Sequence, residues 1–105
     1  MITMHPGEYL AMCYVEPLNL TQKDLAESLG VSTPAVCRLL AGKSDLSPEM
    51  AVRLAYVFDR SAESWMLMQM KHSLQIAKKA LNTKDLKRIS LPAPAEEEDE
   101  ATLAA

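Results

Sequence analysis

The segment from residue 20 to residue 43 carries the side chains in this sequence that are best suited to chemistry. It holds two short helical patterns joined by a three-residue turn at Gly30. One side of the second pattern is left with short or polar side chains, namely Ser32, Thr33, Pro34, Ala35 and Arg38. Such a face can enter a DNA groove without a steric clash, and the N-terminus of its helix offers N–H donors to phosphate. The pattern predicts nucleic-acid binding; the simpler interpretation is a compact helical hairpin.

The residue types needed for catalysis or metal binding are not grouped in the sequence. A nucleophile with its base needs His near Ser or Cys, and the two histidines are expected in an N-terminal arm (His5) and on a surface helix (His72). Cys13 and Cys37 do not form a Cys-x-x-Cys pair, and the sequence has no Gly-rich phosphate loop. We therefore predict that the protein is not an enzyme and holds no metal or cofactor.

Five helices are expected to position the polar face. Their starts are marked by a proline or by a hydroxyl that can cap a helix, at Pro6, Thr21, Ser32, Ser47 and Ser61. The first helix is expected to reach about Val15, the next two to end at Gly30 and Gly42, and the long last one to reach about Leu81. Apolar residues recur with a helical period, without the period-two alternation of strands. The predicted fold is all-α.

The two helices around Gly30 need a fixed crossing angle if the polar face is to be presented in one orientation. Ala26 is small and allows the two helices to approach closely. The angle between them is expected to be filled by apolar side chains, namely Leu25, Val31, Val36 and Leu39. Cys13 lies near core positions of the first helix and is expected to pack against this core.

Charge is distributed unevenly along the chain. The 105 residues include 11 Lys and Arg and 14 Asp and Glu, a net charge of −3. Five of the acids form the run Glu96 to Glu100, and without them nine acids remain against 11 bases, a net charge of +2. A mildly basic body removes an objection to nucleic-acid binding. We expect one domain over residues 1–81 and a disordered, acidic tail over residues 82–105.

The composition favours a reduced, cytoplasmic globular protein. The chain is 49% hydrophobic and 24% charged, which is ordinary for a globular domain. It has no apolar run long enough to cross a bilayer and no features of a secretion signal at its start, so no membrane contact is expected. Two cysteines do not make a disulfide framework.

The expected last helix carries an apolar stripe with alternating three- and four-residue spacing. The stripe consists of Leu67, Met70, Leu74, Ala77 and Leu81. Trp65 and Met68 fall on another face, which leaves the stripe available as a dimer seam; the simpler interpretation is packing on its own domain. Dimerisation also suits DNA reading, because two reading helices related by a two-fold axis can contact a palindrome about one DNA turn apart.

The run from Leu20 to Phe58 resembles the Xre/Cro family of phage-type repressors. The match consists of a Gln, a Leu-Ala pair, a Gly-Val pair, a Val and a Gly-Lys pair at characteristic spacings, at Gln22, Leu25-Ala26, Gly30-Val31, Val36 and Gly42-Lys43. The resemblance implies a five-helix helix-turn-helix domain of the lambda-repressor/Cro type.

The resemblance also implies DNA-contacting roles for single residues. Gln22 and Lys43 match phosphate-contacting residues, and Ser32 is expected to donate to the DNA backbone. Thr33, Pro34 and Arg38 are expected to face base edges, and the Arg38 guanidinium can bind guanine through two hydrogen bonds. The simpler interpretation of Arg38 is an exposed, solubilising charge. Pro34 and Ala35 depart from the longer polar residues usual there, which implies contact with thymine methyl groups or weak discrimination.

The flanking segments resemble the HigA antitoxin group, whose members are also called virulence-associated VapI proteins. The resemblance rests on His5-Pro6-Gly7-Glu8 before the first helix and on Ser64-Trp65-Met66-Leu67-Met68-Gln69 after the Ser61 cap. It implies a homodimeric repressor that binds palindromic double-stranded operator DNA, neutralises a HigB-type mRNA-cleaving toxin and represses their shared operon. The alternatives are a freestanding Cro-like regulator without a toxin, and an interaction protein that has lost DNA binding.

Overall fold

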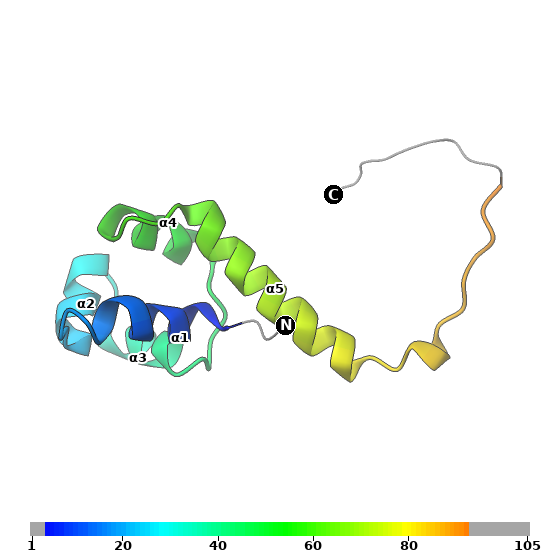
Figure 1. Cartoon of the computed structure of the whole chain (residues 1–105), viewed down its shortest axis with the longest axis horizontal. Coiled ribbons are helices and arrows are strands. Elements are labelled where there is room, and N and C mark those ends of the chain that lie inside the picture. The colour runs from blue at the N-terminus through cyan, green and yellow to red at the C-terminus, as the bar shows by residue number, and fades with distance from the viewer. Residues whose placement is uncertain (1–3, 93–105) are drawn as a thin grey trace.

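The computed structural model describes residues 4–92, and this part of the chain is helical, without a strand. The elements in chain order are α1 (Pro6–Leu10), the π-helical turn η1 (Ala11–Val15), α2 (Gln22–Leu29), α3 (Thr33–Leu40), α4 (Pro48–Val57), α5 (Ala62–Ala80) and the 3-10 turn η2 (Thr83–Asp85). Helices α1 to α4 form a cluster, and α5 runs from α4 out of it (Figure 1). The predicted all-α fold with five helices and a long last helix is confirmed.

Helix starts are fixed by local hydrogen bonds at the positions that the sequence predicts. The hydroxyl oxygens of Thr21, Ser32, Ser47 and Ser61 each accept the backbone N–H of the residue three positions later, at 3.0 to 3.2 Å. Each bond satisfies one of the N–H groups that a helix start leaves without an internal partner, a contribution of about 1 kcal/mol. The starts of α2 to α5 are therefore encoded within four residues.

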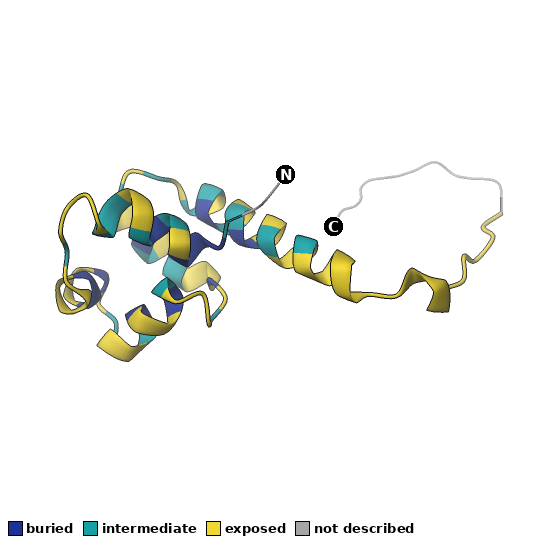
Figure 2. Cartoon of the chain, turned by 60° about the horizontal axis from the view of Figure 1, so that its bottom comes forward, coloured by how far each residue is buried: buried dark blue, intermediate teal, exposed yellow. Residues whose placement is uncertain are grey.

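The core lies where α1 to α4 meet the first half of α5 (Figure 2). Its buried apolar residues are Leu10, Leu25, Ala26, Leu29, Val36, Leu39, Leu46, Ala51, Leu54 and Trp65. The expected filling of the angle between α2 and α3 is confirmed, with Val31 half-buried. Gly7 allows α1 to lie directly on the end of α3, because a Cβ there would come within 1.7 Å of the Leu39 carbonyl oxygen.

The first helix differs from the expected regular helix in its second half. Residues Ala11–Val15 form a π-helical turn, with the Glu16 N–H bonded to the Ala11 carbonyl at 2.9 Å. The i→i+5 bond adds a residue to this turn and moves the inward face to Tyr14 and Val15. The expected packing of Cys13 against the core is therefore wrong: its side chain is exposed.

His5 is likewise not part of a free N-terminal arm. Its side chain is buried and caps α1, with Nδ1 accepting the Gly7 N–H at 2.9 Å. The ring also meets that of His72 edge-on, with 5.1 Å between the ring centroids. The sequence-based expectation is wrong because the contact with His72 joins residues that are 67 positions apart.

The predicted tail lies partly outside the described residues. Residues 82–92 are exposed and contain the short turn η2. The acidic run Glu96 to Glu100 lies beyond residue 92, outside the described part. Within residues 4–92 no helix is long and apolar enough to span a membrane, and no group of three His, Cys, Asp or Glu residues is placed to hold a metal ion.

Candidate nucleic-acid interface

The turn between α2 and α3 is built on glycine. Gly30 has φ of +71°, a backbone conformation that side-chain-bearing residues rarely adopt. Its N–H donates to the Glu27 carbonyl at 3.3 Å, and the Val31 N–H donates to the Ala26 carbonyl at 3.0 Å. These two bonds form a Schellman motif that closes the end of α2. Ser32 then caps α3, so only three residues separate the two helices.

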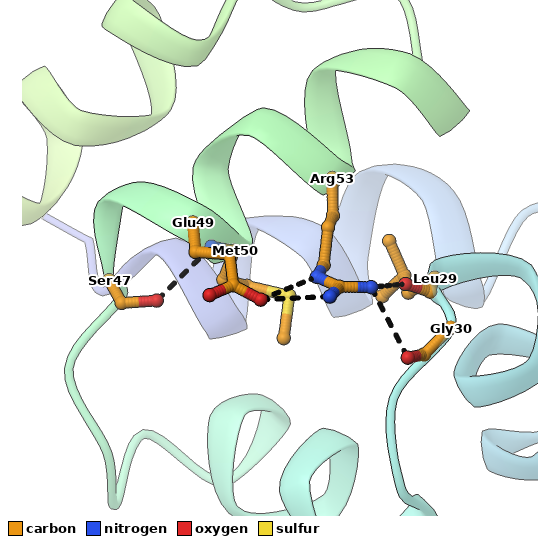
Figure 3. Close-up of polar contacts among 6 residues, drawn as sticks. All are labelled: Leu29, Gly30, Ser47, Glu49, Met50 and Arg53. Carbon is orange, nitrogen blue, oxygen red and sulfur yellow. Dashed lines mark hydrogen bonds and ion pairs between the residues drawn. The ribbon is translucent and has the colours of Figure 1, made fainter.

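Arg53 of α4 holds this turn from outside the motif (Figure 3). Its Nη1 donates to the carbonyl oxygens of Leu29 and Gly30, at 2.8 and 3.2 Å. Its Nε and Nη2 donate to the Glu49 carboxylate one turn earlier in α4, at 3.2 and 2.8 Å. A cation at the C-terminus of α2 satisfies free carbonyls and opposes the negative end of the helix dipole. This role of Arg53 could not be predicted from the sequence, because nothing local connects the residue to the turn.

The predicted reading residues lie on the exposed side of α3. Thr33, Pro34 and Arg38 are exposed, whereas Val36 and Leu39 on the other side are buried. Pro34 and Arg38 are four residues apart and so lie above one another on one face. Cys37 is also exposed, beside Arg38. The helix therefore presents a short, polar surface with one long cation.

Ser32 is placed where it can serve both the helix and a ligand. Its Oγ accepts the Ala35 N–H at 3.2 Å, which uses one lone pair. A hydroxyl also has a proton to donate, and the residue is exposed. Capping and the predicted donation to a DNA phosphate are therefore compatible.

Lys43 follows α3 immediately after a second glycine turn. Gly42 has φ of +72°, and the N–H groups of Gly42 and Lys43 donate to the carbonyls of Leu39 and Arg38, at 3.0 and 2.9 Å. This second Schellman motif fixes the Lys43 backbone at the C-terminal end of α3 while its side chain is exposed.

Gln22 lies apart from the α3 group. It is the first residue of α2 and is exposed, next to the Thr21 cap. The length of α2, about 12 Å at 1.5 Å per residue, separates it from the turn at Gly30. The structure therefore gathers Ser32, Thr33, Pro34 and Arg38 at one helix and leaves Gln22 and Lys43 as separate flanking positions.

The predicted dimer stripe is exposed in the single chain. Leu67, Met70, Leu74 and Leu81 are each about half exposed, at 46 to 56%, and Ala77 is exposed. Trp65 is fully buried on another face of α5. Leu81 is the residue that caps α5 rather than part of the helix. The stripe therefore does not pack on its own domain.

An aromatic cluster joins the first helix to the start of α5. Tyr14 stacks on Phe58, with 4.5 Å between ring centroids, and its hydroxyl donates to Asp59 at 3.0 Å. Burial, reinforced by the bond to Asp59, raises the pKa of Tyr14 above its ordinary value of 10.0. Arg60 lies over the Tyr9 ring, 4.6 Å from the centroid, and donates to the Tyr9 hydroxyl at 2.8 Å. Tyr9 and Tyr14 also meet the ring of Trp65 in α5, with 5.7 and 6.1 Å between centroids, so the cluster holds the start of α5 on the bundle.

Comparison with known proteins agrees with this arrangement. The helix-turn-helix family matches residues 14–65. The uncharacterized HTH-type transcriptional regulator YddM of Escherichia coli K12 is 32% identical over 84 residues, covering 80% of this chain and 88% of YddM. Virulence-associated protein I of Dichelobacter nodosus is 32% identical over 77 residues, covering 73% of this chain and 71% of the relative.

Solved structures give the same relationship. The Pseudomonas aeruginosa antitoxin HigA with the higBA promoter superposes with a TM-score of 0.76 at 33% identity, covering 89% of this chain and 100% of HigA. The antitoxin GraA superposes with a TM-score of 0.79 at 29% identity, covering 85% of this chain and 99% of GraA. The family consists of DNA-binding regulators and antitoxins and is not an enzyme family. The chain belongs to the helix-turn-helix family of transcriptional regulators, in the group of the HigA-type antitoxins.

Proposed function

We propose that this chain is a sequence-specific operator-binding repressor and the antitoxin of a HigB/HigA-type operon. The observation that carries the proposal is the exposed polar side of α3, which two Schellman turns and the Ser32 cap hold in one orientation. A rigid helix with a short polar face fits the DNA major groove. The relative with 33% identity, HigA of Pseudomonas aeruginosa, has been solved with its promoter.

The residues divide into those that position the protein and those that read sequence. Gln22, Ser32 and Lys43 contact phosphates on either side of the groove, which supplies affinity without sequence information. Thr33 and Pro34 lie against base edges. Arg38 makes the main base contact, since a guanidinium can pair with the O6 and N7 acceptors of guanine.

The reading unit is a homodimer formed through α5. The proposed seam is the exposed stripe Leu67, Met70, Leu74, Ala77 and Leu81, within a DNA-binding and dimerisation unit of residues 1–81. On a palindromic operator, the two copies of α3 in this dimer need to lie about 34–36 Å apart, one turn of DNA. The support is the exposure of the stripe, because apolar side chains at this spacing on one helix face are typical of a helix–helix interface.

A freestanding transcriptional regulator is the second candidate, because YddM, which aligns with 80% of this chain, is named as a regulator. The two functions differ in the presence of a toxin. Co-expression with the product of an adjacent toxin-sized gene separates them: an antitoxin restores growth that the toxin alone arrests. If no adjacent gene product arrests growth, the chain is a freestanding regulator.

DNA reading is tested by binding the purified chain to its own promoter fragment and to a scrambled duplex at 50 and 200 mM salt. We expect specific binding that weakens steeply with salt, because released counterions drive phosphate contacts. Arg38→Ala is expected to cost about 1–3 kcal/mol on the promoter and to reduce the preference for it. Arg88→Ala, which removes an exposed arginine outside the helices, is the control and keeps that preference. Equal binding of both duplexes by the wild type contradicts the proposal.

A further inference from the structure

The loop between α3 and α4 is held by a side chain of α5. The Oε1 of Gln69 accepts the Leu46 N–H at 2.7 Å, and Gln69 is only 5% exposed. Leu46 itself is buried in the core. A buried amide that pairs with a buried N–H is costly to break, because both groups then lose a partner that water cannot replace. Gln69 is therefore an anchor point for this loop.

The orientation of the Gln69 amide is fixed by its other partners. Its Nε2 donates to the Ser73 Oγ one turn later in α5, at 2.9 Å, and approaches Asp45 Oδ1 at 3.4 Å. Both of these atoms accept hydrogen bonds, so the nitrogen faces acceptors and the oxygen faces the Leu46 donor. The side chain thus links α5 to two consecutive loop residues.

The backbone around Lys43 is held by hydrogen bonds at Lys43 itself, at Ser44 and at Leu46. Its own N–H is bound to the Arg38 carbonyl in the Schellman turn, and Leu46 follows three residues later. The carbonyl of the intervening Ser44 accepts a hydrogen bond from Nε2 of the buried His5, at 3.0 Å. The backbone on both sides of Lys43 is therefore held in place, which reduces the entropy lost when its side chain contacts a ligand.

We infer that Gln69 is a positioning residue for DNA binding, which holds the Lys43 loop in place from α5. The inference rests on the proposed operator binding. It also connects the two proposed surfaces, because Gln69 lies in α5 directly before Met70 of the dimer stripe.

The test compares operator binding by Gln69→Met and Ser73→Ala with that of the wild-type chain. Gln69→Met keeps the length of the side chain and removes its hydrogen bonds, whereas Ser73→Ala removes only the contact within α5. We expect Gln69→Met to weaken operator binding about tenfold, the equivalent of one immobilised side chain, and to reduce the salt slope by about 1. Ser73→Ala leaves the bonds of Gln69 to Leu46 and Asp45 in place, so we expect it to weaken binding less than Gln69→Met and to keep the wild-type slope. An unchanged slope in Gln69→Met overturns the inference.

A double-mutant cycle with Lys43→Ala distinguishes positioning from a general loss of stability. If Gln69 acts through Lys43, Lys43→Ala costs much less in the Gln69→Met background than in the wild type. Additive losses overturn the inference. Failure of the wild type to prefer its operator contradicts the proposed function instead, so the two failures are distinguishable.

Hydrogen exchange of the wild-type chain provides a measurement that does not depend on the folding of Gln69→Met. We expect the Leu46 amide to exchange at least about 100-fold more slowly than in an unstructured peptide. Operator binding is expected to slow it further. Exchange at the unstructured rate, or no change on operator binding, overturns the inference.

Discussion

The α2–α3 unit and α5 differ in how much of their apolar surface is buried within the single chain. Both ends of α2 and α3 are closed by local hydrogen bonds, and their apolar sides are buried. Helix α5 starts in the same way at Ser61, but its buried residues are Trp65 and Gln69, both in the first half. From residue 70 to residue 80 the helix carries apolar side chains on an exposed surface. Figure 2 shows this half of α5 leading away from the bundle.

The difference separates two ways in which a helix is stabilised. The helix-turn-helix unit buries its apolar sides within one chain. Its exposed side is polar, which suits the proposed contact with DNA. The second half of α5 lacks such packing, and most helical stability in proteins comes from packing of an apolar face. We therefore expect changes in the exposed second half of α5 to act through assembly, whereas changes around the α2–α3 turn act through the stability of the single chain.

The largest effect is expected from Leu74→Glu, in the middle of the exposed stripe. A carboxylate in an apolar seam loses its hydration when the two chains associate, and this cost is expected to dissociate the dimer. Operator affinity is expected to fall by about 100-fold or more, because the second half-site is no longer held close to the first. Sedimentation velocity measures the oligomeric state, and gel-shift titration measures the affinity.

Ile76→Glu is the matched control for this prediction. Ile76 is 56% exposed and lies two residues after Leu74, about 200° around the helix from it and outside the stripe. We expect it to leave both the dimer and the affinity unchanged. A dimer that resists Leu74→Glu but dissociates with Ile76→Glu places the seam on another face of α5.

A smaller effect is expected from Arg53→Met, which removes the clamp on the turn. The Leu29 and Gly30 carbonyls lose their charged donor while the apolar stem of the side chain is retained. The side chain is partly exposed, at 37%, so we expect a loss of about 1–2 kcal/mol in the free energy of unfolding. Urea unfolding provides the measurement. Glu49→Gln, which leaves both carbonyl contacts in place, is expected to cost less than about 0.5 kcal/mol. Equal losses of unfolding free energy in the two variants would mean that Arg53 stabilises the fold through its ion pair with Glu49 and not through the carbonyls.

The sequence predicted the features that depend on neighbouring residues. The caps at Thr21, Ser32, Ser47 and Ser61 and the turn at Gly30 each need only a few consecutive positions, so all were found. The exposed face of α3 followed from the same periodicity.

The features that were not predicted depend on residues far apart in the chain. Arg53 reaches carbonyls 23 and 24 positions earlier, and Gln69 binds Leu46, also 23 positions earlier. Neither residue has a periodic signal, since arginine and glutamine are ordinary residues of an exposed helix. The π-helical turn that exposes Cys13 changes the helical period itself, and a search that assumes 3.6 residues per turn misplaces the residues after it.

The smallest effect is expected from Tyr14→Phe, which tests how the complete bundle holds the first half of α5. At pH 7 the change removes one hydrogen bond to Asp59 and keeps the stacked ring, so we expect a loss below about 1 kcal/mol.

Below pH 10 the phenol is neutral in both states, and its contribution is fully present. Because the folded pKa is raised, the unfolded chain releases this proton first as the pH rises, and the contribution is lost as the pH passes through the folded pKa. The unfolding free energy of the wild type should therefore fall more steeply than that of Tyr14→Phe above pH 10, as measured by urea titration. Tyr56→Phe, at a residue that is 90% exposed, is the control and should follow the wild type. Identical slopes for wild type and Tyr14→Phe would show that this phenol is solvated like Tyr56 and that the rings alone attach α5 to the bundle.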